Sequence, residues 1–524
     1  MKEKFRRCWA LVLVFVIVTG VCFLFAGRKS GMFIDEIYAY GLSNSHYAPF
    51  LTDIKDGEMV GKTFTRQELF DYVAVTDGER FDFGSVYYNQ VHDVHPPLHY
   101  WLLNAVCSLF PNTFTKWTGL ALNYVLYMLT MFVLYKTVRK LGYSVGNGTA
   151  AAVLYGLSVI GMSTFVMIRM YMLLTLLTVV LMYLIVCLMR EFKPKYCILT
   201  GLVLLAGLIT QYYFVFYAFF LCAGYVIYAL MKKDKALAWF IPCALVGALS
   251  LLLVFPACLD HLFADNIVSG GNAMENLRNF AQYPVRLKTF ISFVTHGLKA
   301  AMIIALLAVI ALCVCFKKLR AAKDGKLDLR ALVLIVPAII VLVIVALISP
   351  VDEPRYIYNL IPAFVLGVSL LLHLLEETFG SFERERLIKT AALLGIMALA
   401  LWQARCVPPD YLYPEYAEYD AIVAEHSDDK CVYFSDNMFE AITQDLLQLM
   451  AFDDFYVSDD TDLTGALDYV GGADEFVAYV DISVFWSSGY DPDKIISALA
   501  DASDYDKAEL LYQNGLSATY LISK

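Results

Sequence analysis

Long apolar segments with few or no charges dominate this chain and fix what it can fold into. Eleven of them follow one another before residue 405, and most approach the roughly 20 residues that a helix needs to cross a bilayer. They lie at residues 8–26, 118–135, 146–166, 170–189, 196–211, 213–231, 236–256, 295–316, 331–349, 356–375 and 390–404. With 59% hydrophobic residues, the chain is too apolar for an ordinary soluble protein. We therefore predict a polytopic α-helical membrane protein with about 11 spans.

Basic residues indicate which connections face the cytoplasm. If the spans alternate, 22 of the 35 basic residues before Arg405 fall in the N-terminus and in five alternate connections. Those connections are residues 136–140, 190–195, 232–235, 317–330 and 376–389. This distribution fits the positive-inside rule. We expect a plasma-membrane protein whose first span is retained, whose N-terminus is cytoplasmic, and whose long stretches 27–117, 257–294 and 405–524 lie outside.

The composition changes at Arg405: from Arg405 to Lys524, 25 residues are acidic and only 5 are basic. Short strand patterns alternate with helical patterns here, which is typical of a small layered α/β domain. The expected strands are residues 431–435, 454–458, 475–481, 509–512 and 518–523, and the expected helices are 438–450, 462–470 and 491–503. We predict two domains: a membrane domain over residues 1–404, which includes the outer loop 27–117, and an extracytoplasmic α/β domain over residues 405–524.

Two adjacent carboxylates, Asp35 and Glu36, follow the first apolar segment and are flanked by Phe33, Ile34 and Ile37. A carboxylate among apolar neighbours at a lipid boundary is desolvated, which raises its proton affinity and suits a general base. The alternative is that these two residues only begin a solvated loop. The same outer loop ends in the sequence HPPLHYW, residues 95–101, where a helix too short to span is expected to lie along the membrane.

Two arginines lie within or next to predicted membrane spans, where burying a charge costs free energy. Arg169 lies alone between the uncharged stretches 141–168 and 170–189, and such a residue usually faces a polar cavity or a partner, although it could also reach the interface. Arg355 opens a later span beside Tyr356, which could flank a lipid phosphate or anchor the helix at the interface. The charges of the second outer loop, Arg278, Arg286 and Lys288, could steer a phosphate, but we expect them to be solvated.

The order of these features resembles the GT-C glycosyltransferases. The resemblance is to family 39 and its bacterial relatives, which include protein O-mannosyltransferases and the lipid A aminoarabinose transferase. It rests on the Asp-Glu pair, on the H-P-P-L-x-Y-W element, on RMYMLL at residues 169–174 and on EPRYIYNLIP at residues 353–362. It covers about residues 8–375 and implies a GT-C fold. It also implies transfer of a sugar from a carrier such as undecaprenyl or dolichyl phosphate to a hydroxyl of an extracytoplasmic protein, lipid or glycopolymer.

The resemblance assigns the role of base to Asp35, with Glu36 as its neighbour. Relatives with a lysine before Pro-Pro use a cation there near the lipid phosphate; this sequence has His95, whose role stays open between phosphate, acceptor and neither. Chemically, a glycosyl phosphodiester needs a base for the incoming hydroxyl and cations for the departing phosphate. We expect Arg169, Arg355, His95 and Tyr356 to bind that phosphate. A single carboxylate without a paired nucleophile favours inversion.

A metal site and a different function remain as alternatives. His92, His95 and His99 could offer ligands to a divalent ion, but the glutamate of an HExxH motif is missing and two prolines interrupt the helix. Alternatively, the three residues are ordinary polar loop histidines or bind phosphate. Apart from this possible divalent metal, the sequence indicates no cofactor, and it indicates no nucleic-acid partner.

A transporter or lipid flippase is the alternative function. It would show broken helices and charges near the midplane of the membrane, whereas the polar groups here gather at outer span ends.

Overall fold

The computed structural model describes residues 2–263, 276–315, 328–379, 385–436, 440–483 and 489–524. They form two compact units. We call residues 1–26, 94–99 and 120–410 the helical unit, and residues 27–93, 100–119 and 411–524 the sheet unit. The outer loop is therefore compact with the acidic tail, whereas the sequence-based division placed it with the spans. That division into residues 1–404 and 405–524 stays a prediction.

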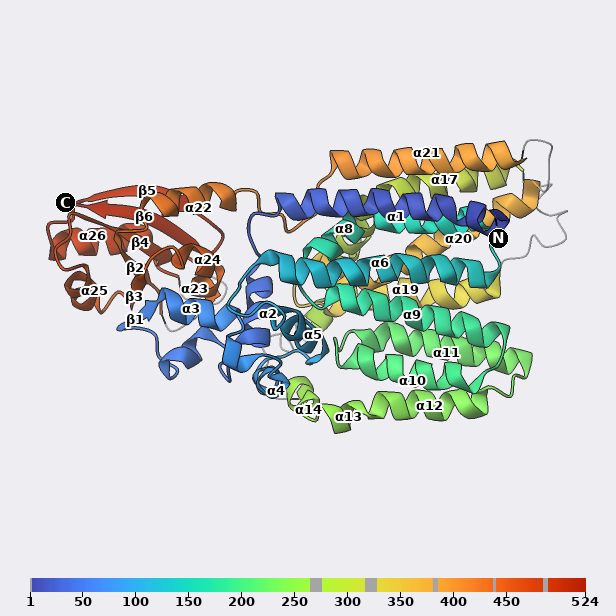
Figure 1. The fold of residues 1–524 in the computed structure, drawn as a ribbon, viewed down its shortest axis with the longest axis horizontal. Coiled ribbons are helices and arrows are strands. Elements are labelled where there is room, and N and C mark those ends of the chain that lie inside the picture. The colour runs from blue at the N-terminus through green and yellow to red at the C-terminus, as the bar shows by residue number, and fades with distance from the viewer. Residues whose placement is uncertain (1, 264–275, 316–327, 380–384, 437–439, 484–488) are drawn as a thin grey trace. The chain divides into compact units, whose positions relative to one another are not determined.

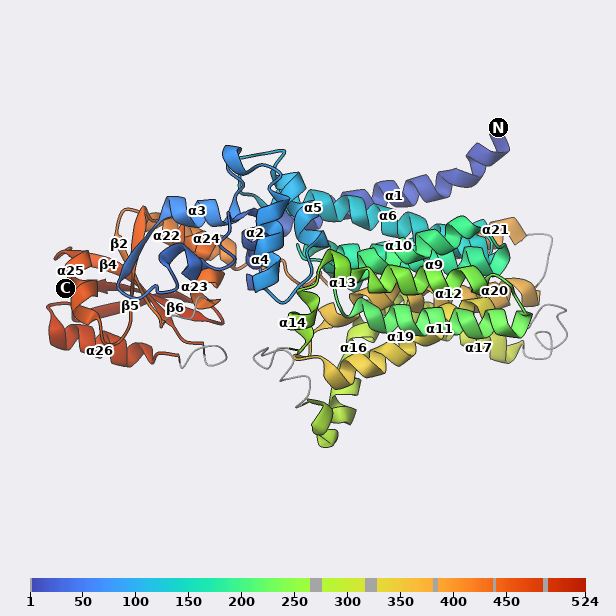
Figure 2. The same ribbon diagram turned by 90° about the horizontal axis from the view of Figure 1, so that it is seen from below.

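Long apolar helices make up the helical unit and run side by side in both views (Figures 1 and 2). Its elements are α1 (Lys2–Arg28), α6 (Lys116–Leu141), α7 (Val145–Gly156), α8 (Val159–Val166), α9 (Tyr171–Arg190), α10 (Pro194–Leu208), α11 (Phe214–Lys232), α12 (Leu237–Leu249), α13 (Leu251–Val254), α14 (Cys258–Phe263), η3 (Phe280–Gln282), α16 (Tyr283–Gly297), α17 (Lys299–Val314), α19 (Leu329–Ile348), η4 (Pro354–Leu360), α20 (Ile361–Phe379) and α21 (Glu385–Cys406). The protein is a multi-pass membrane protein, as predicted.

The number of apolar helices is close to the predicted number of about 11 spans. Among the described residues, eight helices are long and apolar enough to cross a membrane, and two bent pairs raise the number to ten. The predicted segment 196–211 corresponds to α10, whose 15 residues fall short of a full span. The last span, expected to be short, has a 20-residue apolar stretch from Leu387 to Cys406.

Both bent pairs have polar groups that satisfy the backbone at the break. α7 and α8 meet at 58°, where the Ser158 hydroxyl accepts a hydrogen bond from the N–H of Gly161 at 3.1 Å. α16 and α17 meet at 90°. There the buried amide of Gln403 accepts from the N–H of Ala300 at 2.7 Å and donates to the carbonyl of Gly297 at 3.1 Å. Breaks inside a membrane are tolerated only where such partners exist.

The sheet unit contains one six-stranded mixed sheet with the order β1-β3-β2-β4-β6-β5. Its strands are β1 (Lys62–Thr65), β2 (Lys430–Phe434), β3 (Asp454–Ser458), β4 (Glu475–Asp481), β5 (Lys507–Gln513) and β6 (Ser517–Ser523). Its helices are α2 (Ile34–Asn44), η1 (Leu51–Lys55), α3 (Arg66–Val73), η2 (Asp77–Glu79), α4 (Phe83–His92), α5 (Leu98–Cys107, which begins in the helical unit), α22 (Tyr416–Glu425), α23 (Glu440–Gln444), α24 (Leu446–Leu449), α25 (Leu463–Val470) and α26 (Pro492–Ala502). β2 is parallel to β3 and β4, and the other neighbours are antiparallel.

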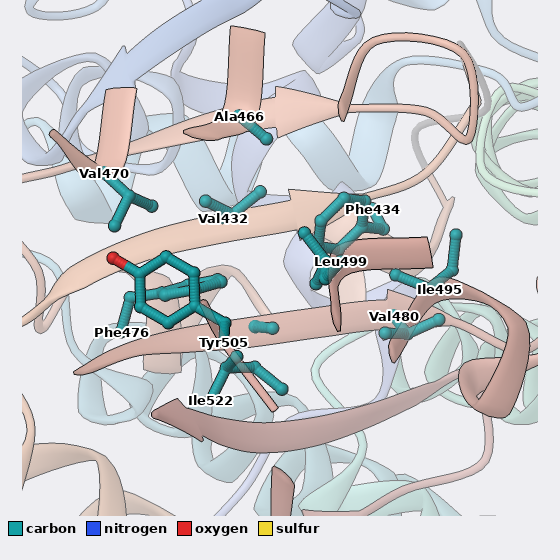
Figure 3. Close-up of a cluster of buried hydrophobic side chains, with 11 residues drawn as sticks. Val432, Phe434, Ala466, Val470, Phe476, Val480, Ile495, Leu499, Tyr505 and Ile522 are labelled. Carbon is teal, nitrogen blue, oxygen red and sulfur yellow. The ribbon is translucent and has the colours of Figure 1, made fainter. Parts of the chain in front are cut away.

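The predicted α/β character of the tail is confirmed, because all five expected strands are present. Side chains of β2 and β4 pack against α25 and α26 in a core that includes Val432, Phe434, Val480 and Leu499 (Figure 3). Sequence reasoning missed α22 and β1. β1 is only four residues long and belongs to the first outer loop, yet it pairs antiparallel with β3.

The pairing of β1 with β3 can be tested at Phe64. Phe64 is fully buried and its ring stacks on Phe455 with the ring centroids 5.4 Å apart. Because Phe64→Ala removes this buried ring and leaves a cavity, we expect it to lower the stability of the sheet unit by about 3–5 kcal/mol. Thermal unfolding of the purified protein measures the effect. Thr63→Ala, at a half-buried neighbouring position, is the control, and equal effects of the two changes would contradict the pairing.

Candidate functional site

Glu36 stabilises the start of helix α2. It is the third residue of the helix, and its carboxylate accepts a hydrogen bond from the N–H of Phe33 at 2.8 Å. This arrangement satisfies a backbone donor at the helix start and places negative charge where the helix dipole favours it. The Glu36 side chain is completely buried. Asp35 precedes it in the same turn and is partly exposed.

Lys29 provides the charge that allows Glu36 to be buried. Its Nζ lies 2.8 Å from Oε2 of Glu36, and both side chains are 0% exposed. The same Nζ donates to the carbonyl of Tyr411 at 2.6 Å. Burial lowers the pKa of Lys29, while Glu36 acts in the opposite direction. Sequence reasoning missed Lys29, because a lysine directly after a span normally reads as an interface residue.

The surroundings of Asp35 are acidic as well as aromatic. Burial raises the pKa of Tyr38, one turn further along α2, and the nearby carboxylates of Glu440 and Asp35 add to this effect. Burial also raises the pKa of Glu440. Asp35 and Glu440 therefore both lie near the phenol of Tyr38.

Arg169 lies inside the helical unit on the turn that joins α8 to α9. Only 3% of it is exposed, which does not fit a side chain reaching for the interface. The buried amide of Asn123 holds this turn by donating to the carbonyls of Phe165 at 3.0 Å and Met167 at 2.7 Å. The pKa of buried His99 falls to about 3 through burial and then through the charges of Arg169 and His95. The structure thus brings Arg169 close to the H-P-P-L element.

Arg355 and Tyr356 lie on η4, which packs against α8 and α9. The Arg355 guanidinium is 5.5 Å from the centre of the Tyr356 ring, and its Nε is 2.9 Å from Oε2 of Glu353. Tyr171, two residues after Arg169, lies 6.0 Å from Tyr358 between ring centroids. The segments that carry the two predicted arginines are therefore neighbours.

Arg286 was expected to be solvated, and this is wrong. It is 6% exposed and its Nε donates to the carboxylate of Asp352 at 2.8 Å. Its Nη2 donates to the carbonyl and the hydroxyl of Ser349 at 2.5 and 2.8 Å. The signal was the spacing of Arg286, Phe290 and Val294, which places all three on the buried face of α16. Arg278 and Lys288 are exposed, as expected.

The three candidate metal-binding histidines are divided between the units. His92 is in the sheet unit, where its Nδ1 lies 2.9 Å from the carbonyl of Tyr88. His95 and His99 are in the helical unit. In the part of the chain that the structure describes, three side chains with ligand atoms within 4.8 Å of one another occur at His426, Asp429 and Glu475 instead. The metal prediction at His92, His95 and His99 stays untested.

Known proteins show what this architecture resembles. Residues 94–259 match the family model described as dolichyl-phosphate-mannose-protein mannosyltransferase. The crystal structure of ArnT from Cupriavidus metallidurans bound to undecaprenyl phosphate is similar, with 13% identity, a TM-score of 0.53 and 98% of each chain covered. The apo form gives 12% identity, a TM-score of 0.48 and coverage of 98% and 97%. The crystal structure of the Archaeoglobus fulgidus oligosaccharyltransferase gives 10% identity and a TM-score of 0.43, and the match covers 100% of this chain and 75% of the oligosaccharyltransferase.

Comparison with curated proteins returned no significant match in sequence. The similarity to the lipid-bound ArnT structure covers almost the whole of both chains, and it confirms the predicted fold: a helical membrane part followed by a C-terminal mixed-sheet part. The match to the mannosyltransferase family model contains His95, His99 and Arg169.

The buried pair of Lys29 and Glu36 makes a prediction about stability. Lys29→Met leaves the Glu36 carboxylate buried without its cation, so we expect a loss of about 3–5 kcal/mol. The double variant Lys29→Met/Glu36→Gln removes both charges and keeps an acceptor for the N–H of Phe33, and it should recover most of the loss. Unfolding temperatures in detergent measure both. A double variant as unstable as the single one would contradict the importance of the pair.

Proposed function

We propose, from the premise that this chain is a membrane protein with the GT-C glycosyltransferase fold, that it transfers a sugar from a polyprenyl-phosphate donor to an extracytoplasmic hydroxyl. The observation that carries the proposal is the burial of Arg169 beside the H-P-P-L element, within the segment that matches the mannosyltransferase family. A buried arginine needs an anionic partner or a polar cavity. The undecaprenyl phosphate bound to ArnT supports a lipid phosphate as the donor group.

The donor phosphate is assigned to Arg169 and Arg355, with His95 and Tyr356 beside them. Arginine is suited to this task because its planar guanidinium can bind two phosphate oxygens at once. Arg286 has a supporting role. It binds Ser349 and Asp352, which directly precede η4, and so fixes the approach of the segment that carries Arg355.

The base is Asp35. Its carboxylate takes the proton of the acceptor hydroxyl, the acceptor oxygen bonds to the anomeric carbon, and the bond from that carbon to the phosphate oxygen breaks. Polyprenyl phosphate leaves with the electron pair of that bond. Glu36 keeps its position in α2 through Lys29 and Phe33, which makes it a positioning residue. This is a single displacement without a covalent enzyme intermediate, so it inverts the configuration at the anomeric carbon.

The proposed topology places the N-terminus in the cytoplasm and the sheet unit outside. This topology follows from the excess of basic residues in the N-terminus and in alternate connections between the spans. The acceptor is accordingly an extracytoplasmic protein, lipid or glycopolymer.

A lipid flippase or transporter is a second candidate, favoured by the two bent helix pairs α7/α8 and α16/α17. Broken helices line substrate paths in many transporters. The two functions separate in proteoliposomes with a polyprenyl-phosphate sugar. A flippase moves the lipid across the bilayer without making a glycosylated product, whereas a transferase releases polyprenyl phosphate when an acceptor is present.

Asp35→Asn tests the base. The amide has the same size but cannot accept the proton, so we expect sugar transfer to fall by a factor of about 10²–10⁴ while donor binding persists. Release of polyprenyl phosphate from a labelled donor measures the rate. Asp71→Asn is the matched control, since Asp71 lies on the same loop, where its carboxylate accepts a hydrogen bond from the amide of Gln67 at 2.8 Å. Full turnover by folded Asp35→Asn protein would remove Asp35 from the mechanism.

Arg355→Gln tests the phosphate site. Loss of one guanidinium that contacts a phosphate should weaken binding of polyprenyl phosphate by about tenfold or more, because hydrogen bonds between charged groups contribute about 1.5–3 kcal/mol. Titration of the purified protein with polyprenyl phosphate, followed by native mass spectrometry, measures the affinity. Lys288→Gln, an exposed position on α16, should leave the affinity unchanged. Equal affinities of the two variants would exclude Arg355 from the site.

A further inference from the structure

A polar cavity lies within the helical unit, away from all residues assigned above to catalysis or donor binding. Its volume is about 470 Å³. The residues that line it come from the ends of several helices: Leu141 ends α6, Arg190 ends α9, Lys232 ends α11, Arg330 is near the start of α19, and Glu377 is near the end of α20. Segments far apart in the sequence thus place their charged ends around one space.

The positive charges in this cavity exceed the negative ones. Arg330 binds Asp328 through Nε and Nη2, both at 2.9 Å, so this carboxylate is already neutralised. Arg190 donates from Nη2 to the carbonyl of Leu141, which carries no net charge. In the described parts of the chain, no carboxylate is paired with Arg190 or Lys232. Two cations therefore face the cavity against the single remaining carboxylate of Glu377.

We propose that this cavity binds the phosphodiester group of a membrane phospholipid. Arg190 and Lys232 are the last residues of two spanning helices, so they lie where the chain leaves the hydrocarbon and headgroups begin. Basic pockets between membrane helices are known binding places for lipid headgroups. Leu141 and Leu329 also line the cavity and offer apolar surface to the acyl chains of the lipid.

Glu377 indicates which phosphate fits. A phosphodiester carries one negative charge, which two cations and one carboxylate balance. A phosphate monoester carries about 1.5–2 negative charges near neutral pH, and inorganic phosphate also carries more than one, so Glu377 would repel the additional charge. With the proposed topology, all these helix ends lie on the cytoplasmic side, so the lipid comes from the cytoplasmic leaflet. Phosphatidylglycerol is a suitable probe because its headgroup has no charge besides the phosphodiester.

The experiment is a titration of the delipidated full-length protein with phosphatidylglycerol, followed by native mass spectrometry. Wild-type protein should retain one lipid, and Lys232→Gln should weaken the affinity about fivefold, as expected for one basic residue at a membrane surface. Lys233→Gln is the matched control, because this exposed lysine is the next residue and does not line the cavity. Arg190→Gln should weaken binding similarly, but it also removes the bond to Leu141.

Three results would overturn the proposal. Equal affinities of Lys232→Gln and Lys233→Gln would show that the cavity does not bind the lipid. Equal retention of diacylglycerol would show that the phosphate is not recognised. Displacement of phosphatidylglycerol by inorganic phosphate at equal concentration would assign the site to free phosphate. The unfolding temperature of each variant without lipid confirms folding, and the titration measures no sugar transfer, so its outcome is independent of the proposed enzyme function.

Discussion

A charge buried in an apolar chain must be compensated, and this requirement governs the most informative parts of the structure. Moving an ion out of water costs several kcal/mol even after relaxation. At Lys29, the Glu36 carboxylate and the carbonyl of Tyr411 offset this cost. At Arg286, the groups that offset it belong to Asp352 and Ser349. Each compensated cation fixes a segment that carries a proposed functional residue: α2 with Asp35, and the approach to η4 with Arg355.

The same requirement explains why the helices break where they do. A bend in a spanning helix exposes backbone N–H and carbonyl groups that lipid cannot satisfy. Ser158 accepts the bond at one break and Gln403 both accepts and donates at the other. Asn123 similarly satisfies two carbonyls just before Arg169. A few buried polar side chains therefore allow non-helical backbone, and with it a buried arginine, inside a helical bundle.

Most of the spans and all the strands of the tail could be predicted from the sequence, because the spans are long apolar stretches and the tail alternates short strand and helix patterns. The apolar stretches and the strands of residues 431–523 are regular over enough positions to stand out. β1 could not be predicted, since four residues of KTFT in a loop become a strand only through β3, almost 400 positions later in the chain. Lys29 was missed and Arg286 was predicted wrongly for a related reason: whether a charge is solvated or buried depends on partners such as Tyr411 and Asp352, which are distant in sequence.

Contacts within the sheet unit give the acidic tail a structural role. The tail holds the first outer loop at several points. The N–H of Ser30 donates to the carbonyl of Leu412 at 2.8 Å, and the amide of Gln444 donates to the carbonyl of Met32 at 3.2 Å. β1 extends the same sheet at its edge. Since α2 begins at Ile34, directly after these contacts, the tail fixes the start of the helix that presents Asp35. The proposed base, Asp35, must be held in place to act on an acceptor, and the tail supplies part of that support.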